Sequence, residues 1–534
     1  MNIVLPVIGG LALFLYGMNL MGSGLQKSSG NKLKRLIELL TNNRIVGVLI
    51  GALVTMVIQS SSATTVMVIG FVNGGLMTLG QAVGVIMGAN IGTTITSQII
   101  AFNLVDYAPI AVAAGVAMYL IVTRQKFKHA AEILIGFGIL FIGMDMMSGG
   151  LKPLAELNAF SEVLVSLENP VLGMLVGVGL TTLLQSSSGS TGLLQALGGQ
   201  GLIEIGITLP VLFGGNIGTT TTAMLSSIGA NKTAKRAAVI HFLFNVTGTI
   251  LFMTLFRGPM ESLILRLSPG DVSRQIANSH TIFNIASVII FLPFAGLLVK
   301  AAEKLVPGDD GLEITESKHL DPRILETPSI ALGQAKQEVF HMAELVLENL
   351  QLVEKAYLDD GFDDVEKVLD TERKINTIER EITDYLIRLS HSDLSDEEHR
   401  EITSLINIIN DIERVGDHIE NIAEEADYKF ENNIKFSELA VSELREMFKM
   451  CKEVFEIAML SYKEEDQDLA KSVLSLEEEI DVLENKHRSN HIDRLNKGYC
   501  ESAPGVLFLD ALSNLERIGD HSFNISMYVL DKFK

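Results

Sequence analysis

Residues 59–65 of this 534-residue chain read QSSSATT, and apolar sequence lies on both sides of them, IVGVLIGALVTMVI (45–58) before and VMVIGFV (66–72) after. A second polar cluster, QSSSGST (185–191), lies between LVGVGLTTLL (175–184) and GLLQAL (192–197). One hydroxyl-rich cluster is ordinary where membrane helices pack closely, because small polar side chains let their backbones approach. Two copies at matched positions need a common explanation.

The two clusters belong to an internal repeat with an offset of 126 residues. Residues 43–97 and 169–223 share 21 identities over 55 positions without a gap, against roughly a tenth expected by chance for this composition. The repeat contains a second pair of motifs, GANIGTT (88–94) and GGNIGTT (214–220). We expect the repeats to span about 9–123 and 135–256, followed by an extra membrane span at 277–300.

Charge divides the chain into two halves. Residues 1–308 are mostly apolar and carry a net charge of +6, whereas residues 309–534 carry −28 and show helical periodicity. This pattern predicts a membrane domain (1–305), a linker (306–329) and a soluble helical domain (330–534). The only cysteines, Cys451 and Cys500, lie in the acidic half, which favours a reducing, cytoplasmic location for it. No nucleic-acid partner is expected.

The charges of the loops predict that the repeats have opposite orientations. The loop at 25–44 has a net charge of +4, and its repeat partner at 152–169 has −2. By the positive-inside rule the first loop is cytoplasmic and the second is outside. An inverted repeat of this kind is typical of secondary transporters, whose sites lie near the bilayer midplane between the repeats. We expect a multi-pass protein of the cytoplasmic membrane with about seven spans.

The polar clusters are expected at the tips of two re-entrant hairpins. QSSS divides 45–73 into pieces of 14 and about 10 residues, each shorter than the roughly 20 residues that a full span requires. The same argument applies to 170–200. GANIGTT and GGNIGTT are expected to unwind their spans at the Gly-Asn-x-Gly core, giving broken helices. Helix N-termini suit an anion, and helix C-termini and unwound carbonyls suit a cation such as Na⁺.

The polar clusters have two other interpretations. The first is ordinary helix packing, which explains one cluster better than four clusters in two matched pairs. The second is a serine nucleophile, but neither QSSS run forms a strand-to-helix elbow, and no histidine or acid lies nearby in the sequence. His241 and His280 fall within apolar spans and are expected to be packed, hydrogen-bonded core residues. We therefore expect no enzyme activity.

The paired QSSS runs, the GANIGTT and GGNIGTTTT segments and KRAAVIHFLFN (235–245) resemble the type II sodium/phosphate cotransporter family over residues 1–305. The resemblance implies Na⁺-coupled transport of inorganic phosphate across the bilayer. It also implies a substrate and ion site made of the two QSSS runs, the two asparagines and neighbouring hydroxyls. The implied residues are Gln59, Ser60, Ser61, Ser62, Thr64, Thr65, Asn90, Thr93, Thr94, Gln185, Ser186, Ser187, Ser188, Ser190, Thr191, Asn216, Thr219 and Thr220.

The acidic half contains a second repeat. IERVGDHIENI (412–422) corresponds to LERIGDHSFNI (515–525), and VLDTERKIN (368–376) corresponds to VLSLEEEID (473–481). Two three-helix units are the simplest architecture. Acidic residues four positions apart share a helical face, and such pairs on facing helices can bind metals. A solvated acidic face is the alternative. The pairs are Glu413/Asp417, Glu477/Asp481 and Glu516/Asp520.

The ERxGDH motif in both copies resembles the PhoU family, which implies a divalent or iron-type metal and a regulatory role in phosphate transport. Asn376 departs from the pattern, because its repeat counterpart is Asp481. The expected fold is therefore all-α, with a polytopic membrane domain and a PhoU-like bundle on the cytoplasmic side. A phosphate-sensing receptor and a transporter of another oxyanion remain alternatives, and a homodimer remains open.

Overall fold

A computed structural model of the chain describes residues 4–38, 43–153, 162, 164–308, 317, 319–359, 362–392 and 394–531. Helices dominate these residues and none of them lies in a β-strand, which confirms the all-α fold class. Contacts divide the chain into two units, Met1–Glu313 with Asp321–Ile330, and Ile314–Leu320 with Ala331–Lys534. The loops predicted at 25–44 and 152–169 and the linker at 306–329 lie partly outside the described residues.

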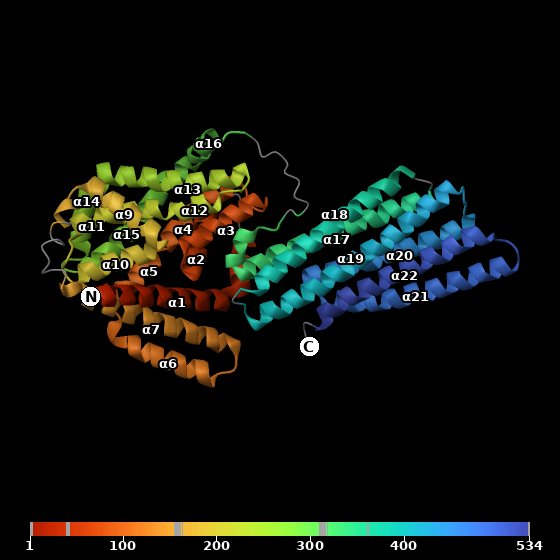
Figure 1. The fold of residues 1–534 in the computed structure, drawn as a ribbon, viewed down its shortest axis with the longest axis horizontal. Helices are drawn as coiled ribbons and strands as arrows, with labels where there is room; N and C mark the ends of the chain where they lie inside the picture. The colour runs from red at the N-terminus through yellow and green to blue at the C-terminus, as the bar shows by residue number, and fades with distance from the viewer. Residues whose placement is uncertain are drawn as a thin grey trace. The chain divides into compact units, whose positions relative to one another are not determined.

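The first unit repeats one helical pattern (Figure 1). Five helical stretches in its described part are long and apolar enough to cross a membrane, which makes it a multi-pass membrane domain. Its helices are α1 (Val4–Glu38), α2 (Arg44–Ile58), α3 (Ser61–Asn73), α4 (Leu79–Gly92), α5 (Thr94–Ile100), α6 (Ala108–Ile121), α7 (Gln125–Leu151), α9 (Pro170–Leu184), α10 (Ser187–Gly199), α11 (Ile205–Gly218), α12 (Thr220–Ser226), α13 (Lys232–Leu251), α14 (Arg257–Leu267), α15 (Val272–Phe291) and α16 (Ala295–Leu305), with short 3₁₀ or π segments η1 (Val105–Tyr107), η3 (Phe252–Phe256), η4 (Leu292–Phe294) and η5 (Pro322–Glu326).

The 126-residue repeat is preserved element by element. Helices α2 and α9 have 15 residues each and α3 and α10 have 13. Helices α4 and α11 have 14, and α5 and α12 have 7. Helix α2 packs on α4 as α9 packs on α11, while α12 packs against α3 and α5 against α10. Each repeat therefore places its short helix beside the serine-rich helix of the other repeat.

Glycines make the helix pairs α2/α4 and α9/α11 possible. A Cβ atom on Gly88 would lie 2.0 Å from the carbonyl oxygen of Val48, and one on Gly214 would lie 2.0 Å from that of Met174. No side chain fits at such a distance, so only glycine allows these backbones to touch.

The predicted unwinding at Gly-Asn-x-Gly is wrong. Helix α4 continues through Gly92 and α11 through Gly218. The interruptions fall at Thr93 and Thr219, whose backbones keep right-handed helical angles. The glycines of the motif serve close packing, because a Cβ on Gly92 would lie 2.6 Å from the Ala52 carbonyl oxygen. The helices are thus interrupted by one residue, and the asparagines stay within helical turns.

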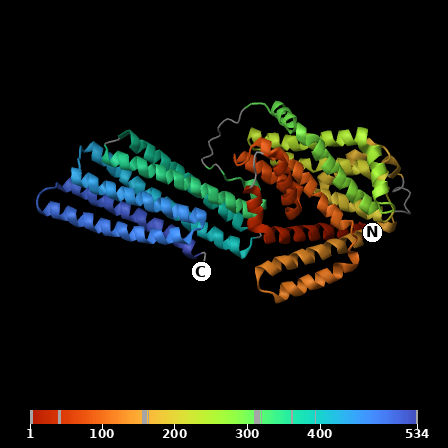
Figure 2. The same cartoon turned by 180° about the vertical axis from the view of Figure 1, so that it is seen from behind.

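The second unit is a bundle of six long helices whose described parts run alongside one another in both views (Figures 1 and 2). They are α17 (Pro328–Leu358), α18 (Phe362–Ser390), α19 (Asp396–Glu431), α20 (Glu438–Glu464), α21 (Gln467–Asn496) and α22 (Ser502–Asp531). Helix α18 packs on α19 as α21 packs on α22, and α19 packs on α22. This arrangement confirms two three-helix repeats that meet through their third helices.

The end of the predicted linker is packed against the first unit. Asp321 is buried and accepts a hydrogen bond from the Nδ2 of Asn73, at the end of α3, at 3.0 Å. Asn73 in turn accepts one from the backbone N–H of Asn231 at 2.9 Å. The side chain of Ile324 fills the space beside Gly70, where a Cβ would lie 2.7 Å from it. Segment η5, which leads directly into α17, is therefore held on the C-terminal end of α3.

Candidate functional site

The two QSSS runs form sharp breaks between consecutive helices. Gln59 ends α2 with a φ of 61°, and Gln185 ends α9 with a φ of 50°, both in the left-handed region. The next residues, Ser60 and Ser186, cap α3 and α10, and their hydroxyls accept from the backbone N–H groups of Ala63 and Gly189 at 3.1 and 3.0 Å. Serine is a preferred N-cap because its short side chain satisfies one orphan donor of the first turn.

These breaks lie around one cavity of about 360 Å³. Helix α1 supplies one side of its lining, and Thr93, from the interruption between α4 and α5, also lines it. The described lining residues are Leu15, Met18, Asn19, Gly22, Ser23, Gln26, Ile58, Gln59, Ser60, Ser61, Ser62, Ala63, Thr93, Leu184, Gln185, Ser186, Ser187 and Ser188. The structure thus brings all eight residues of the two QSSS runs together.

The cavity is polar but carries no formal charge on any described lining residue. Two helices begin at it, α3 at Ser61 and α10 at Ser187, and their unsatisfied N–H groups and positive dipole ends favour an anion. Two helices also end at it, α2 at Ile58 and α9 at Leu184, and their carbonyl ends favour a cation. The same small space therefore suits both signs of charge.

Hydrogen bonds join the two repeats around this cavity. Thr222 Oγ1 donates to Ser62 Oγ at 3.1 Å, and Thr93 Oγ1 lies 3.4 Å from Ser187 Oγ. Within the first repeat, Thr96 Oγ1 donates to Gln59 Oε1 at 2.8 Å. The helix breaks are therefore held by hydrogen bonds from neighbouring helices as well as by their own N-caps. These bonds fix the positions of the hydroxyl groups before any ligand binds.

The other predicted residues lie behind the lining. Thr64, Thr65, Asn90, Thr94, Ser190, Thr191, Asn216, Thr219 and Thr220 are all buried, but none of them lines the cavity. Several donate back to their own helix, as Thr220 Oγ1 does to the Ile217 carbonyl at 2.7 Å. They support the cavity wall in this conformation, and their role in binding stays a prediction.

Sequence reasoning missed the contribution of α1. Asn19, Ser23 and Gln26 line the cavity, and their spacing of three to four residues gives one polar stripe on the apolar N-terminal part of α1. That stripe was the available signal. The repeat did not reveal it, because the counterpart of Asn19 is Asp145, which is exposed.

The second unit gathers its predicted carboxylates on facing helices. One carboxylate oxygen from each of Glu477, Asp481 and Asp520 lies within 4.8 Å of the others. Burial and the neighbouring carboxylates, Asp481 first among them, raise the pKa of Glu477. Crowded carboxylates that resist ionisation fit a bound cation, which would neutralise their repulsion.

The other three-helix repeat contains a carboxylate that the sequence reasoning missed. Glu372 on α18 is fully buried, and neither of its oxygens has a hydrogen-bond partner among the described residues. Burial and then Glu420, Asp417 and Glu413 raise the pKa of its carboxyl to about 8. Its repeat counterpart is Glu477, a predicted metal ligand, and this correspondence is the sequence signal that could have identified Glu372. Glu372 thus joins Glu413 and Asp417 in a second acidic cluster.

The histidines of the two ERxGDH motifs meet between the repeats. His418 and His521 stack with their ring centroids 5.7 Å apart. The Nδ1 of His418 lies 3.0 Å from Asn514 Oδ1, and the Nδ1 of His521 lies 2.9 Å from Asp411 Oδ1. These contacts indicate that the pair joins α19 to α22.

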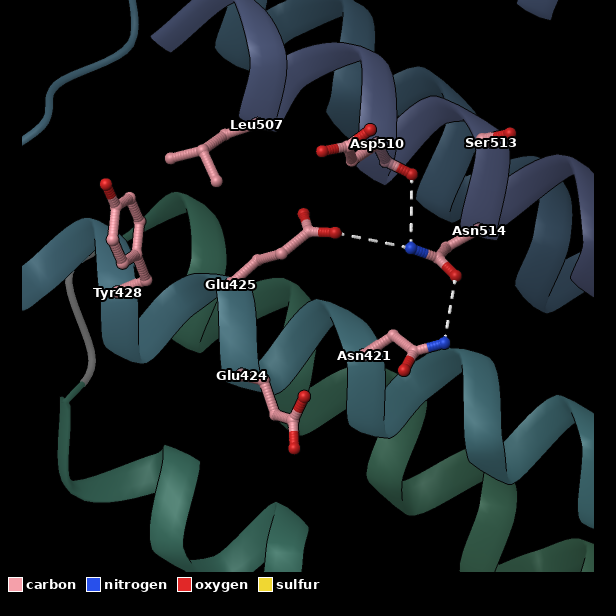
Figure 3. Close-up of a pocket in the computed structure, with 8 residues that line it drawn as sticks. All are labelled: Asn421, Glu424, Glu425, Tyr428, Leu507, Asp510, Ser513 and Asn514. Carbon is pink, nitrogen blue, oxygen red and sulfur yellow. Dashed lines mark hydrogen bonds between the residues drawn. The ribbon is translucent and has the colours of Figure 1, made fainter. Parts of the chain in front are cut away.

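Further along the same helices, side chains of α19 and α22 line a groove of about 420 Å³ (Figure 3). Glu425 lies across it, accepting from Asn514 Nδ2 at 3.3 Å and from the Tyr357 hydroxyl at 3.0 Å. Burial raises the pKa of Glu425 to about 7, and Tyr357 partly opposes this rise. The groove is a titratable part of the repeat interface.

Comparison with known proteins identifies both units. The family model for the Na⁺/Pi-cotransporter matches residues 13–149 and 142–263, and the model for the PhoU domain matches residues 339–426 and 444–529. YqeW of Bacillus subtilis, an uncharacterized protein, is 31% identical over 55% of this chain and 95% of its own length. The chain belongs to the Na⁺/Pi-cotransporter family. Its C-terminal half is made of PhoU domains.

Other relatives of this Na⁺/Pi-cotransporter family member share different parts of it. YjbB of Salmonella typhimurium, whose name assigns it to inorganic phosphate export, is 24% identical over 99% of this chain and 98% of its own length. Sodium-dependent phosphate transport protein 2B of Bos taurus is 36% identical over 22% of this chain and 18% of its own length. The crystal structure of PhoU from Pseudomonas aeruginosa covers 38% of this chain and 96% of that one, with 24% identity and a TM-score of 0.36.

Proposed function

We propose that the chain is a sodium-coupled transporter of inorganic phosphate that works by alternating access, with its PhoU domains as a cytoplasmic regulator. The observation that carries the proposal is the cavity where two helices begin and two end, one of each from each repeat. Phosphate would bind at the N-termini of α3 and α10, whose N–H groups and dipoles favour an anion.

The neutral lining explains why a coupling ion is needed. Phosphate sites that act alone usually carry arginine or lysine, but the described lining contains neither. A bound Na⁺ would supply the missing positive charge next to the anion. Each ion would then increase the affinity of the cavity for the other, and this mutual dependence is the basis of coupled transport.

Uptake of labelled phosphate into proteoliposomes tests this proposal. An inward Na⁺ gradient should drive accumulation and an equal K⁺ gradient should not. Gln59→Ala and Gln185→Ala should each reduce Na⁺-driven uptake by about tenfold or more, because each removes an amide from the helix break. Gln98→Ala is the matched control, since this half-buried glutamine bonds to Thr281 away from the cavity. Saturable phosphate binding without accumulation would indicate a receptor instead.

The direction of transport and the choice of anion belong to the same experiment. The name of YjbB points to export, so efflux from phosphate-loaded vesicles should be measured beside uptake. Arsenate and sulfate should be added as competitors. The hydroxyl-lined cavity favours a tetrahedral oxyanion that can also donate a hydrogen bond, which singles out phosphate and arsenate over sulfate. Complete competition by sulfate would contradict that expectation.

We also propose that the two acidic clusters of the PhoU domains bind a divalent or iron-type metal. The fit rests on the buried, unpartnered Glu372 and on the converging oxygens of Glu477, Asp481 and Asp520. Such a metal would supply positive charge that lets these carboxylates ionise. Metal analysis of the purified chain tests this, and Glu477→Gln with Asp520→Asn should lower the metal content by about half, because the cluster around Glu372 remains.

A further inference from the structure

Two H-x-x-x-N motifs have no counterpart at the 126-residue offset. They are HFLFN (241–245) on α13 and HTIFN (280–284) on α15, and the 39-residue offset between them matches further residues on both sides. All four histidines and asparagines are no more than 2% exposed. Buried polar side chains in apolar helices are costly unless they form hydrogen bonds, so their duplication points to a role.

Helices α13 and α15 occupy equivalent places in the two repeats. Helix α13 packs against α3, α4 and α12, and α15 packs against α10, α11 and α5. Exchanging the two repeats converts the first set into the second. The symmetry of the fold therefore includes a pair of helices that the 126-residue offset does not detect.

Each motif holds one asparagine of the GANIGTT and GGNIGTT segments. Asn90 Nδ2 donates to Asn245 Oδ1 at 2.9 Å, and Asn216 Nδ2 donates to Asn284 Oδ1 at 3.3 Å. Each acceptor is fixed in turn, because the Nδ2 of Asn245 and of Asn284 donates to the histidine carbonyl one turn earlier. The amide groups of Asn90 and Asn216 are therefore oriented by side chains that do not line the cavity.

The two histidines differ in their partners. His280 Nε2 lies 3.4 Å from Asn216 Oδ1, and its Nδ1 lies 3.1 Å from Ser97 Oγ. Neither ring nitrogen of His241 has a hydrogen-bond partner among the described residues. The repeat counterpart of Ser97 is Ala223, which accounts for one missing partner. The amide oxygen of Asn216 is thus engaged by a histidine, while that of Asn90 is not.

Building on the proposed sodium-coupled transport, we propose that Asn245 positions Asn90 as a ligand of the coupling Na⁺, whereas His280 keeps the oxygen of Asn216 occupied. Asn90 lies one helical turn before Thr93, which lines the cavity. Neutral carbonyl oxygens are the ligands that replace the hydration shell of a monovalent cation. Asn245 and His280 are positioning residues, and the coupling ion is expected in the half of the site built by the first repeat.

The Na⁺ dependence of phosphate uptake in proteoliposomes tests this assignment. Asn245→Leu should raise the Na⁺ concentration for half-maximal uptake roughly threefold to tenfold, the loss expected for one orienting hydrogen bond. The KM for phosphate at saturating Na⁺ should stay unchanged. Asn284→Leu should shift the Na⁺ dependence less, because His280 still contacts Asn216. Asn245→Asp keeps an acceptor for Asn90 and should restore most of the Na⁺ affinity.

Thr249→Val is the matched control, because Thr249 is equally buried on α13 but donates to the Phe213 carbonyl. Equal shifts in Asn245→Leu and Asn284→Leu, or none in either, would overturn the assignment while wild-type uptake still required Na⁺. Wild-type uptake without Na⁺ dependence would refute the proposed function itself. If Asn245→Leu does not fold, Asn245→Ala and Asn284→Ala carry the comparison, because each also removes the acceptor, and the larger Na⁺ shift is expected in the first.

Discussion

At the scale of single residues, the sequence revealed the cavity but not its whole lining. The QSSS runs were found because they are duplicated, and the structure brings both into one cavity. Asn19 and Glu372 were missed for different reasons. The repeat does not mark Asn19, because its counterpart Asp145 is exposed. The paired-acid spacing does not mark Glu372, because Asn376 stands where a second acid would complete the pair. Burial and missing partners, which distinguish Glu372, cannot be read from residue types.

The groove between α19 and α22 gives a pH prediction. Burial raises the pKa of Glu425 to about 7, whereas in the unfolded chain it is near 4.5. Between these values the folded state holds a proton that the unfolded state has lost, so stability falls as pH rises through this window. Glu425 should lower the free energy of unfolding of the wild type by about 2 kcal/mol between pH 5 and pH 8, and Glu425→Gln should abolish this decrease.

Thermal unfolding of the full chain in detergent, followed by circular dichroism at pH 5 and pH 8, measures the effect. The neighbouring Glu424, which is exposed, provides the control, and Glu424→Gln should leave the pH dependence as in the wild type. A wild-type chain that is more stable at pH 8 than at pH 5, with Glu425→Gln unchanged from it, would contradict the prediction.

At the scale of helices, the sequence predicted the paired elements but misjudged what the glycines do. Glycine permits both unusual backbone angles and close helix contact, and the residue type alone does not separate these uses. In GANIGTT the second use applies, so Asn90 stays helical. The offset of 126 likewise could not reveal the equivalence of α13 and α15, which are related by their packing and by an offset of 39 residues.

Alanine substitutions at two glycines of α9 distinguish a role in close helix packing from a role in backbone flexibility. A Cβ on Gly177 would lie 2.0 Å from the Val211 carbonyl oxygen, whereas Gly179 has no neighbour within 4 Å. Gly177→Ala should destabilise the chain by about 1–3 kcal/mol, because the α9 and α11 backbones must separate. Gly179→Ala should be neutral or stabilise by up to about 1 kcal/mol through helix propensity. Thermal unfolding in detergent compares them, and equal effects would refute the packing argument.

At the scale of the molecule, charge and apolarity predicted the two units, and the family match confirms their identities. The sequence did not predict that the chain entering α17 is held on α3. Pro322 and Pro328 favoured a plain linker, but Pro322 begins the short helix η5, which Asp321 caps. Such docking depends on Asn73 and Asn231, which lie more than 80 positions away in the sequence.

This docking can be tested by a double-mutant cycle. Asn73→Ala and Asp321→Ala should each raise the rate of limited proteolysis within 317–327, since each leaves a polar partner unsatisfied. The double variant should be less sensitive than the sum of the two single effects predicts, because both substitutions remove the Asn73–Asp321 contact, although Asp321→Ala also removes the cap of η5. Asp466→Ala, which removes a helix cap inside the PhoU domains, should leave this rate unchanged. Additive effects would show that Asn73 and Asp321 act independently.

The left-handed backbone at Gln59 and Gln185 has a consequence for any attempt to engineer the protein. A residue with a side chain pays about 1 kcal/mol or more for this conformation, and glycine does not. Directed evolution for heat resistance should therefore converge on glycine at both positions. Under the proposed function, the resulting variants would survive heating better and carry less phosphate, so a thermostability screen would discard the two side chains that the proposed transport uses.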